Sequence, residues 1–322
     1  MALAVSLVFS GPTFGPVFGG FIMGSSTLDW RWNMWVVVIV GLSASLLCAF
    51  VFPETNTGNP DIKTASEKEG FSLEEITRVY LLRPFCALTS LSPYINSSDD
   101  ITLGLFTTQP ILALLTLYQS FVYGVLFLFY QTYPVAFGEN RGWSTSLKYL
   151  PLMAIICGVF TGAIGIIIHN QMYFRHHCHT PDGTFIPEGR LPPMIVGGIM
   201  VPIGIFWFAW TATPDIPWPS PVCASFLIGC GMYLLFIQGF NYIVDNYTSM
   251  ANSAMGVNGS MRSVFGAVFP LFANQMVQAL GVARTTIILG AFSAALAPVP
   301  ICFWYWGDRI RAWSSAKVPS NV

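Results

Sequence analysis

Long apolar runs alternate with short polar segments along most of the chain, and this pattern predicts its architecture. A helix needs about 20 mostly apolar residues to cross a bilayer. Eight runs meet that length: residues 2–24, 33–53, 109–134, 146–168, 193–213, 220–243, 256–280 and 284–306. Only a few residues separate the last two runs. The pattern predicts an all-α polytopic membrane protein with about eight transmembrane helices.

The basic residues between these runs predict the orientation of the chain. Of its 14 Lys and Arg residues, ten fall on the side of the membrane that holds segment 54–108. The other four are Arg31, Arg141, Lys148 and Arg284. Basic residues concentrate in cytosolic loops. We therefore expect segment 54–108, residue 1 and the tail 309–322 to be cytosolic, in what we expect to be the plasma membrane.

Composition narrows the class of function. Charged residues make up 9% of the chain, against about 25% in a soluble domain. The chain has too few of them to cover a surface that faces water on all sides, so a soluble globular protein is excluded. The formal net charge of −1 gives no reason to expect a nucleic-acid partner. The sequence has no Walker, HExxH or Ser-His-Asp pattern, so we expect no enzyme activity, no catalytic residue and no bound cofactor.

The first apolar run contains a regular pattern of glycine and proline, GPTFGPVFGG over residues 11–20. Two sets spaced by four form neighbouring stripes on a helix: Gly11, Gly15 and Gly19, and Pro12, Pro16 and Gly20. A stripe without Cβ atoms makes a groove into which a second membrane helix can pack. A generic glycine-rich packing face is the alternative interpretation.

This pattern resembles the antiporter motif in the fifth span of drug:proton antiporters of the major facilitator superfamily. Residues 111–139 resemble the seventh span of the fungal twelve-span group, and residues 241–272 and 298–311 continue the similarity. The resemblance implies a partial major facilitator fold that lacks the first four spans. Residues 1–53 would then be the last two spans of the N-terminal half, and residues 109–308 a six-span C-terminal half.

The function implied by the resemblance is proton-coupled export of drugs or secondary metabolites, with the proton gradient supplying the coupling ion. The expected partners are a small amphipathic molecule, the lipid bilayer and a separately encoded N-terminal half. Because proton-coupling acids of the superfamily lie largely in the first four spans, we hypothesise that this chain alone does not transport. The alternatives are a polyamine or small-cation transporter and a non-transporting truncated membrane protein.

The linker 54–108 carries two further expectations. Ser72 and Glu75 match a capping box, which predicts a short amphipathic helix at the membrane surface. Residues 86–106 match nothing in the family pattern, so we interpret them as an insertion, with an ordinary lineage-specific loop as the alternative.

Polar aromatic and amide side chains inside the apolar runs are the candidates for lining a substrate cavity. Aromatic walls with a few polar groups suit bulky amphipathic ligands. Hydrogen bonding between helices is the alternative role for each residue. The resemblance implies an acidic residue near position 131, where this sequence has Gln131, so this helix lacks a carboxylate for proton coupling. The candidates are Tyr118, Gln119, Tyr123, Tyr130, Gln131, Tyr233, Gln238, Asn241, Tyr242 and Asn274.

Two charges near span boundaries, Asp245 and Arg262, are candidates for a gating pair on the cytosolic side. Two separate interfacial charges are the alternative. His169, His176, His177 and His179 lie close together in sequence, but adjacent residues cannot easily surround one ion, so we expect no metal site.

Overall fold

The computed structural model describes residues 2–25, 29–51, 109–174, 187–248 and 251–315. The chain divides into two compact units, one formed by residues 1–29 with 101–322 and the other by residues 30–100. In the second unit the structure describes helix α2 (Arg31–Val51), a single apolar helix whose side chains are largely exposed. The amphipathic helix and insertion predicted within residues 54–108 lie outside the described residues.

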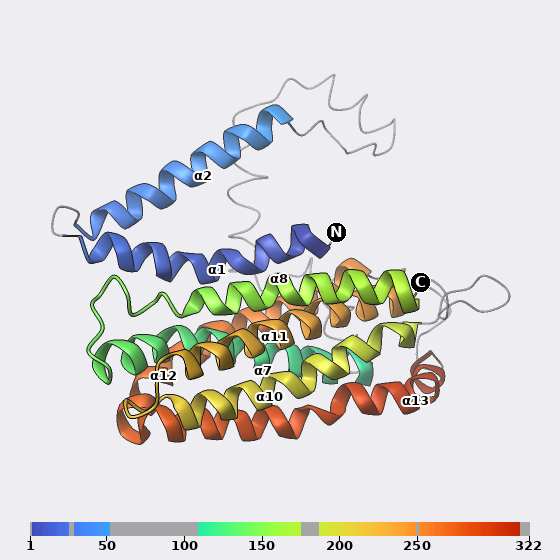
Figure 1. Cartoon of the computed structure of the whole chain (residues 1–322). Coiled ribbons are helices and arrows are strands. Elements are labelled where there is room, and N and C mark those ends of the chain that lie inside the picture. The colour runs from blue at the N-terminus through green and yellow to red at the C-terminus, as the bar shows by residue number, and fades with distance from the viewer. Residues whose placement is uncertain (1, 26–28, 52–108, 175–186, 249–250, 316–322) are drawn as a thin grey trace, which may run out of the picture. The chain divides into compact units, whose positions relative to one another are not determined.

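The described part of the first unit is built from helices (Figure 1). The long ones are α1 (Ala2–Met23), α7 (Pro110–Tyr133), α8 (Leu152–His169), α10 (Leu191–Thr211), α11 (Pro219–Asn246), α12 (Ala251–Leu296) and α13 (Pro298–Ser315). Short turns of other helix types extend them at Pro134–Glu139, Asn170–Phe174 and Pro187–Arg190. The predicted all-α fold is confirmed. Within the described residues, six stretches are long and apolar enough to cross a membrane.

The last of these stretches, Ser253–Gly307, is 55 residues long, too long for one crossing of a core about 30 Å thick. It reverses direction at Gly281, whose φ of 79° and ψ of 165° are accessible almost only to glycine. The Thr285 hydroxyl donates to the Met276 carbonyl across the reversal, at 3.2 Å. Two antiparallel arms therefore meet at Gly281 with almost no loop between them (Figure 1).

Two predicted boundaries were wrong, both at prolines. The run 146–168 begins its helix only at Leu152, after Pro151, and residues 145–151 form turns. The run 284–306 is divided between the second arm of α12 and α13, with Ala297 in a turn before Pro298. Proline lacks the N–H that would continue a preceding helix, so it is favoured at a helix start.

The core of the unit is a layered packing of helices around α11, which contacts both α8 and α10. Glycines allow the close approach on both sides. A Cβ added at Gly229 would lie 2.8 Å from the Cα of Ile155 in α8. One added at Gly231 would lie 3.0 Å from the carbonyl oxygen of Gly197 in α10. Helix α7 packs on α12, and α1 packs on α8.

Helix α1 uses a different stripe for this packing from the one predicted. Among the positions of α1 whose burial the structure describes, the buried ones are Ser6, Ser10, Thr13, Val17 and Gly20. A Cβ added at Gly20 would lie 2.7 Å from the Tyr149 ring, whereas one at Gly11 or Gly15 would meet no atom within 4 Å. Among these three glycines, Gly20 has a close neighbour in the described part of the chain, whereas Gly11 and Gly15 have none.

Candidate functional site

Six aromatic side chains from α1, α7 and α11 contact one another in a continuous set. We call this set the aromatic face: Phe9, Tyr123, Phe127, Tyr130, Phe236 and Phe240. The Tyr123 and Phe127 ring centroids are 4.9 Å apart, and those of Phe9 and Phe236 are 5.3 Å apart. Phe236 is buried, whereas the other five side chains remain half-exposed. An apolar ligand could therefore contact these rings.

Helical spacing explains why the sequence forms this face. Tyr123, Phe127 and Tyr130 follow one another at four and three residues, and Phe236 and Phe240 are four apart, so each group shares one side of its helix. The polar edge of the face joins α1 to α7, since the hydroxyl groups of Thr13 and Tyr130 are hydrogen-bonded at 3.0 Å.

Arg262 of α12 brings a positive charge to the same face. Its guanidinium carbon lies 4.7 Å from the Phe240 ring centroid, 5.4 Å from that of Tyr123 and 5.9 Å from that of Phe236. These distances are within cation–π range. A half-buried cation thus lies on an aromatic surface between the helices.

The predicted cavity residues divide into two groups. Tyr123, Tyr130, Gln131, Asn241 and Asn274 keep part of their surface exposed. Tyr118, Gln119, Tyr233, Gln238 and Tyr242 are fully enclosed by the bundle. In this conformation Gln119 forms the hydrogen bonds between helices that were the alternative interpretation. Asn274 lies on α12 and accepts a hydrogen bond from Gln278 on the same helix, at 3.5 Å.

Gln119 is the centre of a buried polar cluster that joins three helices. Its Oε1 accepts from Asn258 Nδ2 of α12 at 2.8 Å, and its Nε2 donates to the carbonyl oxygens of Leu235 and Phe236 of α11 at 3.4 and 3.3 Å. Asn258 Nδ2 also approaches the Thr116 hydroxyl at 3.3 Å. The cluster fixes α7 against its two neighbours.

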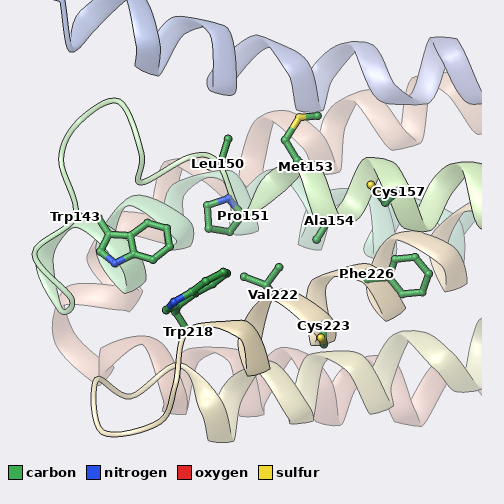
Figure 2. A pocket seen from close by; sticks show the side chains of 10 residues that line it. All are labelled: Trp143, Leu150, Pro151, Met153, Ala154, Cys157, Trp218, Val222, Cys223 and Phe226. Carbon is green, nitrogen blue, oxygen red and sulfur yellow. The ribbon is translucent and has the colours of Figure 1, made fainter.

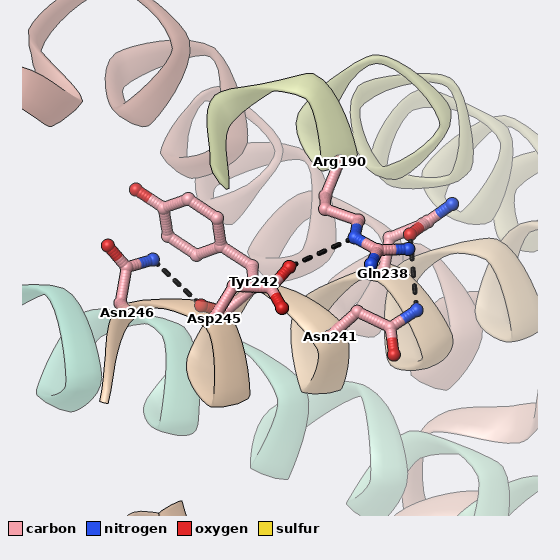
Figure 3. Close-up of polar contacts among 6 residues, drawn as sticks. All are labelled: Arg190, Gln238, Asn241, Tyr242, Asp245 and Asn246. Atoms are coloured by element: carbon pink, nitrogen blue, oxygen red, sulfur yellow. Dashed lines mark hydrogen bonds and ion pairs between the residues drawn. The ribbon is translucent and has the colours of Figure 1, made fainter. Parts of the chain in front are cut away.

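The predicted charge pair of Asp245 with Arg262 is not formed. Asp245, at the end of α11, instead pairs with Arg190 at the start of α10, and Nε and Oδ2 are 3.0 Å apart (Figure 3). Both side chains are 19% exposed. The end of α11 and the start of α10 meet at the same end of the bundle, whereas Arg262 reaches the aromatic face. The pair can therefore hold these two helix ends together in one state of the protein.

We expect the ion pair between Arg190 and Asp245 to contribute measurably to the stability of the protein. Arg190→Gln and Asp245→Asn should each destabilise the protein, and the double variant should lose less than the sum, with a coupling energy of about 1 kcal/mol for this partly buried pair. Thermal unfolding in detergent measures the stability of the unmodified protein, the two single variants and the double variant, which together form a double-mutant cycle. Arg284→Gln, at an exposed position, is the control, and additive single effects would contradict the prediction.

Apart from the aromatic face, a hollow of about 430 Å³ lies between α8 and α11 (Figure 2). Its lining is apolar apart from two cysteines and two indoles, and includes Met153, Phe226, Cys157 and Cys223. The Trp143 and Trp218 rings meet at one end, 5.9 Å apart. It offers no charged group to orient an amphipathic ligand, so the aromatic face is the better candidate site.

The sequence analysis missed Phe9, Phe127, Phe236 and Phe240, because it sought only polar aromatics and amides. The spacing of four residues between Phe236 and Phe240 is the signal that was available. Of the four histidines considered in the sequence analysis, His169 has a ring centroid 5.3 Å from that of Tyr173. Residues 176–179 lie outside the described part of the chain.

Comparison with known proteins agrees with the helical architecture. The family model described as Major Facilitator Superfamily matches residues 1–270. The MFS-type transporter traF of Penicillium crustosum is 41% identical over 316 residues, which cover 96% of this chain and 61% of traF. The MFS-type transporter oryN of Aspergillus oryzae is 38% identical over 98% of this chain and 60% of its own length.

A third relative, the citrinin biosynthesis cluster MFS transporter mrr1 of Monascus ruber, is 38% identical over 97% of this chain and 62% of its own length. The chain thus spans about 60% of the length of these curated relatives. Several apolar helices and a match over most of the chain indicate an integral, multi-pass membrane protein of a transport family. The chain belongs to the Major Facilitator Superfamily.

Proposed function

We propose that this chain takes part in the proton-coupled export of small amphipathic molecules, such as drugs or secondary metabolites. The aromatic face carries this proposal, because half-exposed rings with a few polar neighbours suit a ligand that is apolar on one side and polar on the other. The names of some relatives, mrr1 among them, refer to biosynthesis clusters, which favours a secondary metabolite as cargo.

Proton coupling is proposed from the antiporter-like motif of residues 11–20 alone. The cytosolic C-terminus and the plasma membrane are proposed from the distribution of basic residues and from the resemblance to drug exporters. A polyamine cargo is less well supported, since Arg262 would repel a polycation at the aromatic face. The chain spans about 60% of the length of its relatives, and transport of the kind that their names state is proposed here for this chain.

Efflux from a yeast strain without its main drug exporters tests the function. Cells loaded with Nile red, a neutral amphipathic dye, would express either this chain or this chain joined to the part of traF that precedes the matched region. We expect efflux from the joined protein, its loss on adding a protonophore, and none from this chain alone. Efflux from neither protein would contradict export, and efflux that survives the protonophore would contradict proton coupling.

A matched pair of variants locates the site in the same assay. Tyr123→Ala removes a ring from the centre of the aromatic face and should reduce dye efflux at least fivefold. Tyr305→Ala removes an exposed ring of α13 outside the face and should leave efflux unchanged. Both proteins must reach the membrane in equal amounts, which immunoblotting verifies. Equal effects of the two substitutions would contradict the placement of the site.

A further inference from the structure

Arg262 has unmet bonding requirements that its aromatic neighbours cannot satisfy. Its Nε is buried and has no hydrogen-bond acceptor. Among the residues that the structure describes, Arg262 forms no ion pair, since Asp245 is paired with Arg190. Ring faces attract the charge of a guanidinium, but they do not replace an oxygen acceptor for the buried Nε–H group.

An unpaired guanidinium inside a membrane protein is costly, and such groups mark ligand or ion pathways. Arg262 is also held in a defined place, because Phe240, Tyr123 and Phe236 surround its guanidinium carbon within 6 Å. A planar guanidinium presents paired N–H donors that match the two oxygens of a carboxylate. The group is therefore held beside the rings with a buried, unpaired Nε, as a carboxylate-binding arginine could be.

The surroundings of Arg262 specify the rest of the ligand. The half-exposed rings of Tyr123, Phe127 and Phe240 offer surfaces on which a flat conjugated system can stack. The linked hydroxyl groups of Thr13 and Tyr130 lie at the polar edge of the same face. An acid with a conjugated ring would contact the cation and the rings together.

We infer that Arg262 binds the carboxylate of an anionic, conjugated small molecule whose ring lies on the aromatic face. This inference names a substrate class for the export proposed above and rests on that function. It assigns Arg262 a direct contact with the ligand, in place of the gating role that the sequence suggested.

Binding measurements separate this inference from transport. The purified full chain in lipid nanodiscs would be titrated with 2-naphthoate and with its methyl ester, which has the same ring but no charge. Intrinsic tryptophan fluorescence or calorimetry gives the two affinities. We expect the unmodified protein to bind the acid at least tenfold more tightly than the ester.

Variants assign this preference to one side chain. Arg262→Gln should weaken binding of the acid at least tenfold and change binding of the ester by less than threefold. Arg262→Lys should retain part of the preference, because it keeps the charge but loses the paired donors. Arg284→Gln, an exposed arginine at the turn of α12, should behave like the unmodified protein.

Two outcomes would overturn the inference: equal affinity of the unmodified protein for acid and ester, or an unchanged preference in Arg262→Gln. If neither the acid nor the ester binds, the inference is overturned as well. If the acid binds through Arg262 but cells export neither Nile red nor naphthoate, the export function fails and the assignment of Arg262 stands. If cells export Nile red but the protein does not prefer the acid, the export function stands and the assignment of Arg262 fails.

Discussion

Gly229→Val is expected to separate α11 from α8 and to lower the stability of the protein by roughly 2–3 kcal/mol. A Cβ at Gly229 would overlap the carbonyl oxygen of Ile155 and lie 2.8 Å from its Cα. These are backbone atoms of α8, so no side chain can rotate away and the helices must move apart. Dispersion contacts along the interface, the main attraction between helices in lipid, would then weaken.

The measurement is the apparent melting temperature of the protein in detergent, which should fall by roughly 5–10 °C. Gly165→Val supplies the matched control within α8. A Cβ there meets no atom within 4 Å, and valine is a slightly better helix former than glycine, so the same substitution should change the stability by less than about 1 kcal/mol. Similar losses at the two positions would show that close packing at Gly229 is unimportant.

Gln119→Leu is expected to destabilise the junction of α7, α11 and α12 by about 1–3 kcal/mol. Leucine fills a similar volume but removes the acceptor 2.8 Å from Asn258 Nδ2 and the amide that donates to Leu235 and Phe236. Asn258 is fully buried, and its Oδ1 already has no partner. The loss therefore leaves polar groups unsatisfied in a setting without water.

Gln278→Leu tests whether any amide in α12 would give the same result. Gln278 is exposed, and among the described residues its hydrogen bond goes to Asn274 on the same helix, so its replacement should change stability by less than about 0.5 kcal/mol. Thermal unfolding of both variants under the same conditions makes the comparison. If Gln119→Leu unfolds at the temperature of the unmodified protein, the buried cluster contributes nothing to the fold.

The helices were predictable from sequence because a bilayer requires long apolar runs with internally satisfied backbones. Their partners were less accessible, since helical spacing says which residues share a face but not which helix that face meets. Tyr123 and Tyr130, two of the cavity candidates, both contact Phe127 on one side of α7. The same reasoning assigned Gln119 to a cavity, although it bonds Asn258, 139 residues away in the chain.

The charges illustrate the same limit. Asp245 and Arg262 are both near span ends that were predicted to be cytosolic, and this shared position suggested that they pair. The partner of Asp245 is Arg190, 55 residues earlier, because the start of α10 and the end of α11 meet in space. The aromatic face escaped notice because ordinary phenylalanines, common in any apolar run, form much of it.

The reversal at Gly281 has a consequence for how the protein is made and detected. With almost no connecting segment, the two arms of α12 must enter the membrane together as one helical hairpin during synthesis. That turn therefore leaves little peptide outside the bilayer for an antibody or a protease to reach. A surface epitope belongs instead in the longer connection between α10 and α11, around Asp215, where three exposed residues lie in succession.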